Sequence, residues 1–573
     1  MIGILHGYLL DGSGSNLWTR SVVRALCASG ETVHLVCQEP DPDRYDFISS
    51  VFAYEPDGSM KAQLERDTPF PGRCIMHRPL LGETLPVYVW DEYDDFTEVV
   101  PMTELSAAQL EDYLHRNVAA VTRIVEEHRI TALHANHAVL MSVVAQRVSA
   151  WTGVPYAVMP HGSALEYAVR PDPRLRRLAA DALAGAARII AISEEVAERT
   201  LSLMDDVASL DPHRIRLLDL GVDTSGFQPV PRSSRAGNVQ RVAGLLEGVP
   251  RGRTEAQAQA LRMALEDGAS PSDACGAVGP FDAKKPDAGV EHRLGDIDWE
   301  HDDVAIFVGR LIAAKGIHAL LAALPEVLRE RPRLRLLVVG HGPLRDPLEA
   351  FVHALEHGDR DRATAALVQA GEVDGGDPAH MAAVAQYWQA LAASGRLDEY
   401  WDGARRLVRD NTVVFTGYLT HREMSQLLPA CDVGVFPSMV LESGPLVFLE
   451  AISSGVFPVG TYFGGMQVKI DTVAPRLEPV DAEAMKVRPD PHHIVADLAA
   501  ALPRALEAAP KYAADLRNVA EEHYDWKPVA RRLRALLEEV AVSAGNGSRA
   551  EHAANAGNAA NAGNAAGGMP GDR

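Results

Sequence analysis

The segment Phe436-Pro-Ser-Met-Val-Leu-Glu442-Ser-Gly-Pro445-Leu-Val-Phe-Leu-Glu450-Ala-Ile-Ser-Ser-Gly455 decides the fold. The apolar run that ends at Phe436 predicts a buried strand, and the apolar residues that follow Pro445 predict a helix. A proline is tolerated in the first turn of a helix, because its missing N–H has no partner there in any case. A loop that carries Glu442 joins the two elements. The segment therefore predicts a strand, a loop and a helix in that order, as in a parallel α/β sheet.

The start of this helix predicts an anion-binding site. A helix N-terminus presents unpaired N–H groups and a partial positive charge, which together favour a phosphate. Glu442 and Glu450 cannot bind the phosphate themselves, but their carboxylates suit the hydroxyls of a sugar or a ribose. Their spacing alone is equally typical of ordinary solvated glutamates, so both interpretations stay open at this point.

A second segment, Val308-Gly309-Arg310-Leu-Ile-Ala-Ala-Lys315-Gly316, also follows a predicted strand and opens a predicted helix. Doubly wound sheets bind their ligands at the carboxyl ends of the strands. Arg310 can bind two phosphate oxygens at once, and Lys315 can add a point charge. This basic pair suits a leaving diphosphate and needs no metal to neutralise it; the alternative is a solvated basic cap.

Short β-branched runs alternate with helical patterns along the chain, which predicts parallel α/β architecture. In the first half, helices over 16–28 and 138–151 accompany six predicted strands: 2–6, 32–37, 132–134, 155–159, 188–192 and 214–218. The second half starts the pattern afresh, with helices over 316–329 and 446–454 and strands at 304–308, 335–339, 413–416, 433–436 and 456–459. The predicted fold class is α/β, with two Rossmann-like domains facing each other across a cleft.

Three segments break this rhythm. We expect a first domain over 1–222 and a second over 223–500, the latter with insertions at about 231–303 and 350–410. The second insertion is alanine-rich and helical in pattern, with a break at 371–378. The last residues, 544–573, repeat alanine, glycine and asparagine; this composition cannot bury a core and predicts a disordered tail.

Taken together and in order, these segments resemble glycosyltransferase family 4. The second half carries Gly309-Arg-Leu-x3-Lys315-Gly316, then Leu336-Leu-Val-Val-Gly340-His-Gly-Pro343, Phe415-Thr-Gly417-Tyr-Leu and Glu442-x7-Glu450. The first half carries Gly12-Ser-Gly14-Ser-Asn16, Leu133-His-Ala-Asn-His137, Pro160-His161-Gly-Ser163 and Gly221-Val-Asp223. The resemblance covers most of the chain outside the insertions and the tail. It implies a GT-B fold, a terminal helical segment over 501–543 that returns to the first domain, and retaining hexosyl transfer from a nucleoside-diphosphate sugar to an acceptor hydroxyl.

The resemblance also implies roles for single residues. The catalytic group comprises His161, which faces the reacting sugar, Arg310 and Lys315, which bind the donor diphosphate, and Glu442, which holds the sugar's hydroxyls. The donor-binding group comprises Gly12 and Gly14 in the first loop, Tyr418 and Leu419 near the base, Leu446 and Val447 as phosphate-binding amides, and Glu450 on the ribose hydroxyls.

Two positions depart from the family pattern. An aromatic–glycine pair commonly follows the first glutamate, whereas this chain has Gly444 and Pro445, and Pro445 offers no N–H. The glutamate often found after Gly464-Gly465 is missing, with Gln467-Val-Lys469 nearby. These two departures affect the expected recognition of the sugar. They do not affect the prediction of the diphosphate-binding site.

No metal or other cofactor is expected to take part in the reaction. Gly12-x-Gly14 lacks the third glycine of a dinucleotide fingerprint, and no GxxxxGK[ST] segment occurs, which argues against hydride chemistry and excludes a P-loop ATPase. His134, His137 and His161 are not interpreted as a zinc site, because the first two are expected at a strand end that lines the cleft. Two other functions stay open: sugar-nucleotide epimerisation on the same fold, and a non-catalytic scaffold.

The composition indicates which binding partners and which cellular compartment to expect. The chain has 573 residues, with 78 acidic against 55 basic side chains and a net charge of −23, which argues against nucleic acid and leaves at most peripheral membrane contact. Five scattered cysteines, the lack of an apolar run of ~18 residues and the lack of a basic leader predict a cytoplasmic protein. About half of the net charge lies in 39–112, with 17 acidic and 5 basic residues. In this fold that region lies near the acceptor side, so we expect a neutral or cationic acceptor and not a polyanionic one.

Overall fold

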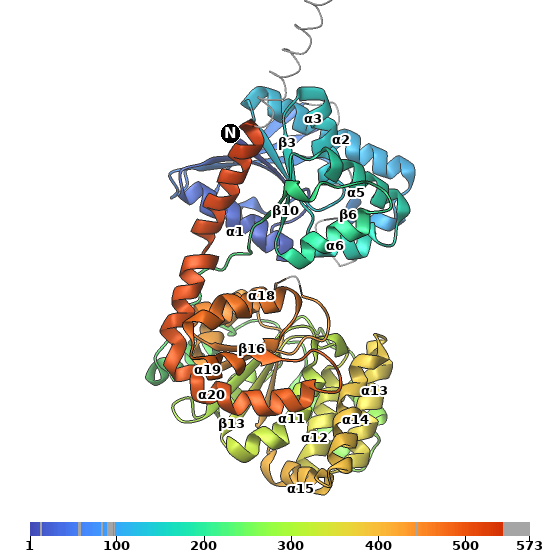
Figure 1. Cartoon of the computed structure of the whole chain (residues 1–573), viewed down its shortest axis with the longest axis vertical. Coiled ribbons are helices and arrows are strands. Elements are labelled where there is room, and N and C mark those ends of the chain that lie inside the picture. Colours follow the sequence, from blue (N-terminus) through green and yellow to red (C-terminus); the bar gives the residue numbers. More distant parts are fainter. Residues whose placement is uncertain are drawn as a thin grey trace, which may run out of the picture. The chain divides into compact units, whose positions relative to one another are not determined.

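The computed structural model describes residues 1–542 apart from 12–13, 56–58, 82–83, 89–95, 97, 443 and the side chain of Ser163. Gly12, the predicted tail 544–573 and the acidic run 91–95 lie outside the described residues. The chain forms two compact units (Figure 1). Residues 1–221 together with 526–542 make the first unit, and residues 222–525 make the second.

The first unit is built on a sheet of order β11-β10-β9-β8-β1-β2-β5-β3-β4, in which β4 runs antiparallel to β3 and the other described pairs are parallel. Its strands are β1 (Ile2–Leu5), β2 (Thr32–Val36), β3 (Ile48–Tyr54), β4 (Met60–Glu65), β5 (Arg73–Pro79), β8 (Ala132–Asn136), β9 (Tyr156–Met159), β10 (Arg188–Ala191) and β11 (Ile215–Leu217). All six predicted strands are present. The prediction misses β3, β4 and β5, because polar and charged residues interrupt their apolar pattern; β4 is exposed along most of its length, as an edge strand can be.

Helices flank this sheet, among them α1 (Gly14–Ala28), α2 (Ala107–His128), α3 (Met141–Thr152), α5 (Pro173–Gly185) and α6 (Glu194–Met204) (Figure 1). Helix α2 begins in a capping box, in which Ser106 accepts from the backbone N–H of Gln109 and the Gln109 side chain accepts from that of Ser106. It ends before Arg129, whose backbone has the left-handed conformation. The ring of its last residue, His128, lies 4.4 Å from that of His34 on β2 and 5.7 Å from that of His77 on β5. A separate pair of short strands, β6 (Thr84–Val87) and β7 (Glu98–Pro101), completes the unit.

The second unit contains a parallel sheet of order β14-β13-β12-β15-β16-β17. Its strands are β12 (Asp303–Val308), β13 (Leu334–Val339), β14 (Val413–Gly417), β15 (Val433–Phe436), β16 (Phe457–Thr461) and β17 (Lys486–Val487). The chain leaves β12 toward β13 and β14 on one side and returns to β15 on the other. The carboxyl ends of β12 and β15 therefore form a topological switch point, the place where open α/β sheets bind ligands. The predicted Arg310 and Glu442 loops follow these two strands.

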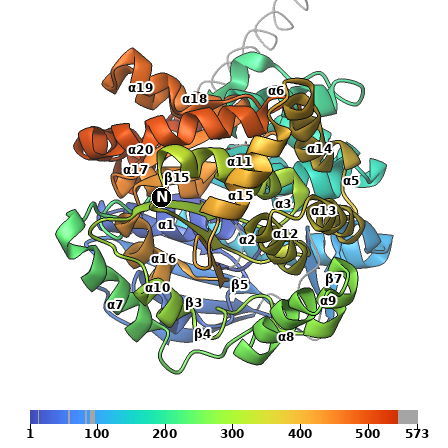
Figure 2. The ribbon, with the colours of Figure 1, turned by 90° about the horizontal axis from the view of Figure 1, so that it is seen from below.

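Both predicted insertions are helical. The first contains α7 (Arg235–Leu245), α8 (Glu255–Glu266), α9 (Pro271–Val278) and α10 (Val290–Gly295); α8 packs on α9 and α10 on α7 (Figure 2). The second includes α13 (Arg360–Asp374), α14 (Pro378–Ala393) and α15 (Leu397–Leu407), which gather with α12 (Arg345–His357) in the yellow and gold part of Figure 1. The expected helix break at 371–378 corresponds to the gap between α13 and α14.

The C-terminal region divides between the two units. Helix α20 (Ile494–Val519) packs on α11 (Ile317–Glu330) and β16, so it belongs to the second unit and not to a returning segment. The helical residues 526–542 belong to the first unit, where Arg534 forms an ion pair with Glu31 at 2.9 Å. The return predicted over 501–543 thus begins later, at Trp526, because the apolar face of α20 is buried on its own sheet. None of the described helices combines the length and the apolar character that crossing a membrane requires.

Candidate active site

The loop after β12 is held against the loop after β13 by backbone contacts. The N–H of Gly309 donates to the carbonyl of Val339 at 3.0 Å, and the N–H of Leu311 donates to the carbonyl of His341 at 2.8 Å. Gly340 has a φ of +144°, and a Cβ at this position would lie 1.9 Å from the carbonyl oxygen of Gly309. Only glycine permits this approach. The glycines of the two predicted segments therefore bring the Arg310 loop and the 340–343 turn together.

The same loop also contacts the loop after β15. Gly316 has a φ of +69°, and a Cβ there would lie 2.0 Å from the carbonyl oxygen of Pro437. The N–H of Met439 donates to the carbonyl of Ala314 at 2.8 Å. Through these contacts the switch point joins the two segments that the sequence predicts to bind the donor. The Lys315 ammonium forms an ion pair with the Glu442 carboxylate.

Arg310 lies in the same loop as Lys315, but its side-chain contacts differ from those of Lys315. Its side chain is exposed, and within the described part of the chain no hydrogen bond or ion pair holds its guanidinium. Glu442, by contrast, is also fixed through its backbone, because its carbonyl accepts from the N–H of Gly465 at 2.8 Å. The loop therefore presents one positioned cation–carboxylate pair and one cation that is available to a ligand.

Helix α17 (Leu446–Ser453) follows Glu442 and begins one residue after Pro445, which is the N-cap and not a first-turn residue. No side chain caps this helix end, and its first turn carries no acidic residue. Within the described residues, the N–H groups of Leu446 and Val447, both half-buried, have no protein partner and are therefore available to an external acceptor. A helix end of this kind favours an anion.

Glu450 lies inside α17, and its side chain is buried. Its Oε1 lies 2.7 Å from Nε2 of His421, the first residue of α16 (His421–Leu427). A buried carboxylate needs such a partner, because an unpaired charge is costly to desolvate. His421 is half exposed, so one side of this pair reaches solvent. Sequence reasoning missed His421, although it follows Tyr418 and Leu419 by only a few residues.

The two residues expected near a nucleotide base differ in exposure. Tyr418 is 38% exposed, and its ring lies edge-on to that of His341 with 5.5 Å between the centroids. Leu419 is buried in the core. The first insertion reaches this edge of the sheet, because Pro286 pairs with Gly417 and the Tyr418 N–H donates to the carbonyl of Lys285 at 3.1 Å. Tyr418 is therefore the accessible member of the pair.

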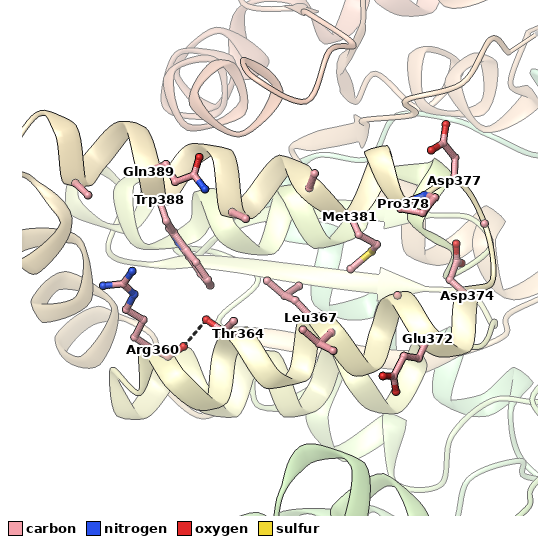
Figure 3. Close-up of a pocket in the computed structure, with 16 residues that line it drawn as sticks. Arg360, Thr364, Leu367, Glu372, Asp374, Asp377, Pro378, Met381, Trp388 and Gln389 are labelled. Carbon is pink, nitrogen blue, oxygen red and sulfur yellow. Dashed lines mark hydrogen bonds between the residues drawn. The ribbon is translucent and has the colours of Figure 1, made fainter.

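A cavity of about 610 Å³ lies between α13 and α14 of the second insertion (Figure 3). Leu367, Met381 and Trp388 point into it from the two helices, and Asp374 and Asp377 stand at one end. Asp374 ties this hairpin to the donor loop, because its Oδ1 accepts from the N–H of Ala313 at 3.0 Å. The insertion thus supports the loop between Arg310 and Lys315. The cavity itself is not lined by any of the side chains predicted to bind the donor's diphosphate and hydroxyls, namely Arg310, Lys315, Glu442 and Glu450.

In the first unit, His161 belongs to a buried polar cluster at the carboxyl ends of β1, β8 and β9. Its Nε2 lies 3.1 Å from Oδ1 of Asn136, which also lies 3.1 Å from Nε2 of His134. The Nδ2 group of Asn136 donates to Thr19 at 2.8 Å, and Thr19 lies 3.2 Å from Nδ1 of His6. Asn136 is therefore the centre that holds three histidines, a role that sequence reasoning did not assign to it.

Burial keeps these histidines neutral. It lowers the pKa of His161 to about 3, with further lowering from His6 and His134, and it lowers the pKa of His6 and His134 to about 4. His137 is buried beside them, and its ring lies 4.8 Å from that of His161. A neutral imidazole can donate from one nitrogen and accept at the other, which suits hydroxyl groups. Gly14 opens α1, and a Cβ there would meet nothing within 4 Å, so this position makes no steric demand for glycine.

Three matches to known domain families bear on these two sites. Residues 13–221 match the glycosyl transferase 4-like domain, and residues 297–364 and 379–502 match two models of glycosyl transferases group 1. The chain carries the domains of a family 4-type glycosyltransferase. The gap between the two group 1 matches falls in α13 and the turn after it, in the second insertion.

One curated relative is also a glycosyltransferase, and two solved structures share the fold of this chain. An uncharacterised glycosyltransferase of Methanocaldococcus jannaschii is 26% identical over 167 residues, and the match spans 29% of this chain and 29% of that relative. The catalytic domain of starch synthase IV from Arabidopsis thaliana, bound to ADP and acarbose, shares 12% identity over 94% of this chain and 99% of its own, with a TM-score of 0.51. The N-terminal domain of a Candida albicans trehalose-6-phosphate phosphatase shares 13% identity over 94% and 96%, with a TM-score of 0.50. The fold of this chain is the predicted α/β, two-domain Rossmann-like GT-B fold.

Within this fold, the predicted residues fall into three groups. Lys315 and Glu442 are in contact, and the Arg310 loop and the α17 N-terminus adjoin them in the second unit. Glu450 pairs with His421 in the same unit, and His161 belongs to the Asn136 cluster of the first unit. Leu419 is buried, and Gly12 lies outside the described residues.

Proposed function

We propose that this protein is a retaining glycosyltransferase that moves a hexosyl group from a nucleoside-diphosphate sugar to an acceptor hydroxyl. The observation that carries the proposal is the group of anion-binding features at one switch point: the available guanidinium of Arg310, the Lys315–Glu442 ion pair and the uncapped N–H groups of α17. The starch synthase of the same fold is bound to ADP, a nucleoside diphosphate, which supports a ligand of this class.

The proposed reaction breaks the bond between C1 of the donor sugar and an oxygen of the diphosphate. The acceptor oxygen forms its bond to C1 on the same face, and its proton passes to the leaving phosphate. Arg310, Lys315 and the N–H groups of Leu446 and Val447 stabilise the charge that develops on the diphosphate. Because the leaving group takes the proton and fixed cations balance its charge, the reaction needs no protein base, metal or other cofactor.

The remaining residues would bind the donor's neutral groups. Glu442 would accept hydrogen bonds from sugar hydroxyls and Glu450 from the ribose hydroxyls, with His421 keeping Glu450 in place. Tyr418 would contact the base. His161 would act toward the reacting sugar as a neutral hydrogen-bonding group, since burial holds its pKa far below 7. The acidic composition of residues 39–112 favours an acceptor that is not polyanionic.

The test is a transfer and donor-hydrolysis assay with Arg310→Ala and Glu442→Ala. The donor is chosen beforehand by a thermal-shift screen of the wild type against UDP, GDP and ADP. Each variant should lose about 100-fold or more in kcat/KM, by analogy with the removal of one charge-stabilising group. Arg406→Ala is the matched control, because Arg406 is an exposed arginine of α15 whose Nε donates to the carbonyl of Asp402 in the same helix. Transfer activity that persists in both Arg310→Ala and Glu442→Ala would contradict the proposal.

Two other functions give different results in the same experiments. A sugar-nucleotide epimerase would convert the donor without any acceptor, which product analysis detects. A non-catalytic scaffold would show no stabilisation by any of the three nucleotides. The available Arg310 and the ordered Lys315–Glu442 pair favour a working donor site over a scaffold.

A further inference from the structure

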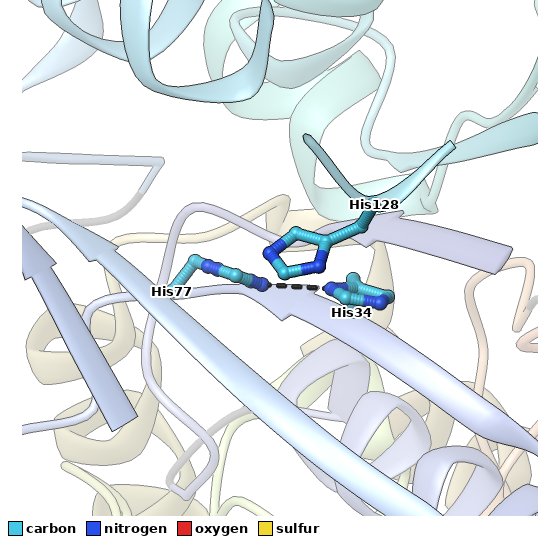
Figure 4. A group of neighbouring side chains, drawn as sticks. All are labelled: His34, His77 and His128. Carbon is cyan, nitrogen blue, oxygen red and sulfur yellow. Dashed lines mark hydrogen bonds between the residues drawn. The ribbon is translucent and has the colours of Figure 1, made fainter. Parts of the chain in front are cut away.

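Three histidines of the first unit lie together away from the Asn136 cluster (Figure 4). His34 is on β2 and His77 on the adjacent parallel strand β5, while His128 is the last residue of α2. In the register of the two strands, His34 faces Ile75 and His77 faces Val36, so both histidines lie on the same face of the sheet. One ring nitrogen from each histidine lies within 4.8 Å of the other two.

The two strand histidines already point at each other. Nδ1 of His34 lies 2.9 Å from Nε2 of His77, and both side chains are buried. Two ligands of a tetrahedral zinc ion with bonds of 2.0–2.1 Å lie ~3.3 Å apart. The separation of these nitrogens is therefore close to that of a ligand pair. His128 is only partly buried, so its ring can rotate to complete the set.

A second observation concerns Tyr54 on β3. Its hydroxyl lies 2.7 Å from Nδ1 of His77, on the far side of the ring from His34. When Nδ1 carries the proton and donates to Tyr54, Nε2 keeps a lone pair directed toward His34. Metal-binding histidines commonly have such a partner on their other nitrogen, which fixes the tautomer and the orientation of the ring.

Not every ring nitrogen of the cluster has a hydrogen-bond partner. Nε2 of His34 is buried without a hydrogen-bond partner in the described structure, and the His34 and His128 rings are 4.4 Å apart. Burial, and then the neighbouring His128, lowers the pKa of His34 to about 4, and burial lowers the pKa of His77 well below its usual value. Neutral imidazole is the form that binds a metal.

We propose that His34, His77 and His128 bind a transition-metal ion, with Zn²⁺ as the preferred occupant and water as a fourth ligand. Imidazole nitrogens favour Zn²⁺ over Mg²⁺ and Ca²⁺, which prefer oxygen ligands. The ion joins the C-terminal end of α2 to the centre of β2 and β5. None of the three ligands belongs to the residues proposed for glycosyl transfer, so the ion stabilises the first unit and takes no part in that reaction.

The experiment uses the full chain, freed of metal with a chelator and titrated with Co²⁺ and then Zn²⁺. We expect one equivalent of Co²⁺ per chain, with the visible absorption of a tetrahedral site, and its displacement by one equivalent of Zn²⁺. His128→Ala should weaken metal binding about 100-fold, because it removes one of the three protein ligands. The variant should still fold, since His128 is only partly buried. His115→Ala is the matched control, since His115 is an exposed residue of the same helix, and it should bind like the wild type.

Two further variants separate metal binding from structural damage. Tyr54→Phe should keep the stoichiometry but weaken binding about 10-fold, because the partner of His77 is lost. His128→Cys should restore binding and add a thiolate-to-cobalt charge-transfer band. The proposal is overturned if the wild type binds no Co²⁺ in stoichiometric amount, or if binding is unchanged in His128→Ala and is lost instead in His357→Ala, which tests the stacked His353–His357 pair of α12.

Discussion

The Lys315 ammonium and the Glu442 carboxylate form an ion pair, although the two residues are 127 positions apart in the chain. Each stands on a loop that leaves the carboxyl end of a different strand, β12 or β15. The pair links the predicted diphosphate-binding loop to the predicted sugar-binding loop. The two functions assigned to these loops are therefore expected to depend on one another.

The first prediction concerns this pair. Glu442→Gln should lower kcat/KM for transfer about 100-fold, because it weakens the hold on the sugar and frees Lys315 from its fixed position. The melting temperature should change little, since a partly exposed ion pair contributes only about 0–1 kcal/mol to stability. Steady-state kinetics and calorimetry measure the two effects. A large loss of stability with unchanged kcat/KM would show that the pair is structural.

The second prediction concerns His421 and Glu450. His421→Ala removes the partner of a buried carboxylate, so the ribose-binding side chain loses its position. We expect the Kd for the matching nucleoside diphosphate to rise about tenfold, with a smaller effect on kcat. Isothermal titration measures the Kd. The control is His492→Ala, which changes an exposed histidine of the same unit; equal effects of the two changes would contradict the assigned role.

The third prediction concerns the support that the second insertion gives to the donor loop. Asp374→Ala removes the acceptor of the Ala313 N–H and should raise KM for the donor about tenfold, because a hydrogen bond to a charged group is lost from the loop. Asp377→Ala is the matched change at the same end of the cavity, where the carboxylate caps α14 by accepting from the Ala379 N–H at 2.9 Å. It should lower stability by about 1 kcal/mol and leave KM unchanged.

The fourth prediction concerns the pH dependence of the first unit. Burial lowers the pKa of His161 from 6.5 to about 3. Between these two pH values, His161 is protonated in the unfolded chain and neutral in the folded chain. The stability that this residue contributes is complete above pH 6.5 and is lost as the pH falls toward 3. The loss amounts to about 1.4 kcal/mol per pH unit for one proton.

Hydrogen exchange of the β8 amides between pH 6.5 and 4.5 follows the opening of this unit, after correction for the intrinsic exchange rate. His161→Gln should reduce the pH slope of the opening free energy by the contribution of one proton. His115→Gln, a change at an exposed histidine, should keep the wild-type slope. Equal slopes in the wild type and His161→Gln would contradict the account given for the buried cluster.

Much of the fold follows from local pattern. Buried parallel strands such as β12 and β15 are short apolar runs, and a glycine or proline marks where each neighbouring loop begins, so their positions can be predicted within a few residues. The edge strand β4 could not be predicted, because its exposed residues have no hydrophobic period. The helices of the two insertions follow from alanine-rich and amphipathic spacing, but their packing on β14 and on the donor loop does not.

The candidate site divides in the same way. The residue types at 309–316 and 442–450 determine by themselves that cations, carboxylates and a helix N-terminus occur beside strand ends. Only the tertiary structure decides that Lys315 meets Glu442, that Glu450 needs His421, and that Leu419 is buried while Tyr418 is exposed. It alone places His34, His77 and His128 together, since their spacing in the chain carries no period of a helix, a strand or a metal motif. The physical reason is that strand order and loop closure, which arise from contacts between distant segments, determine which side chains meet.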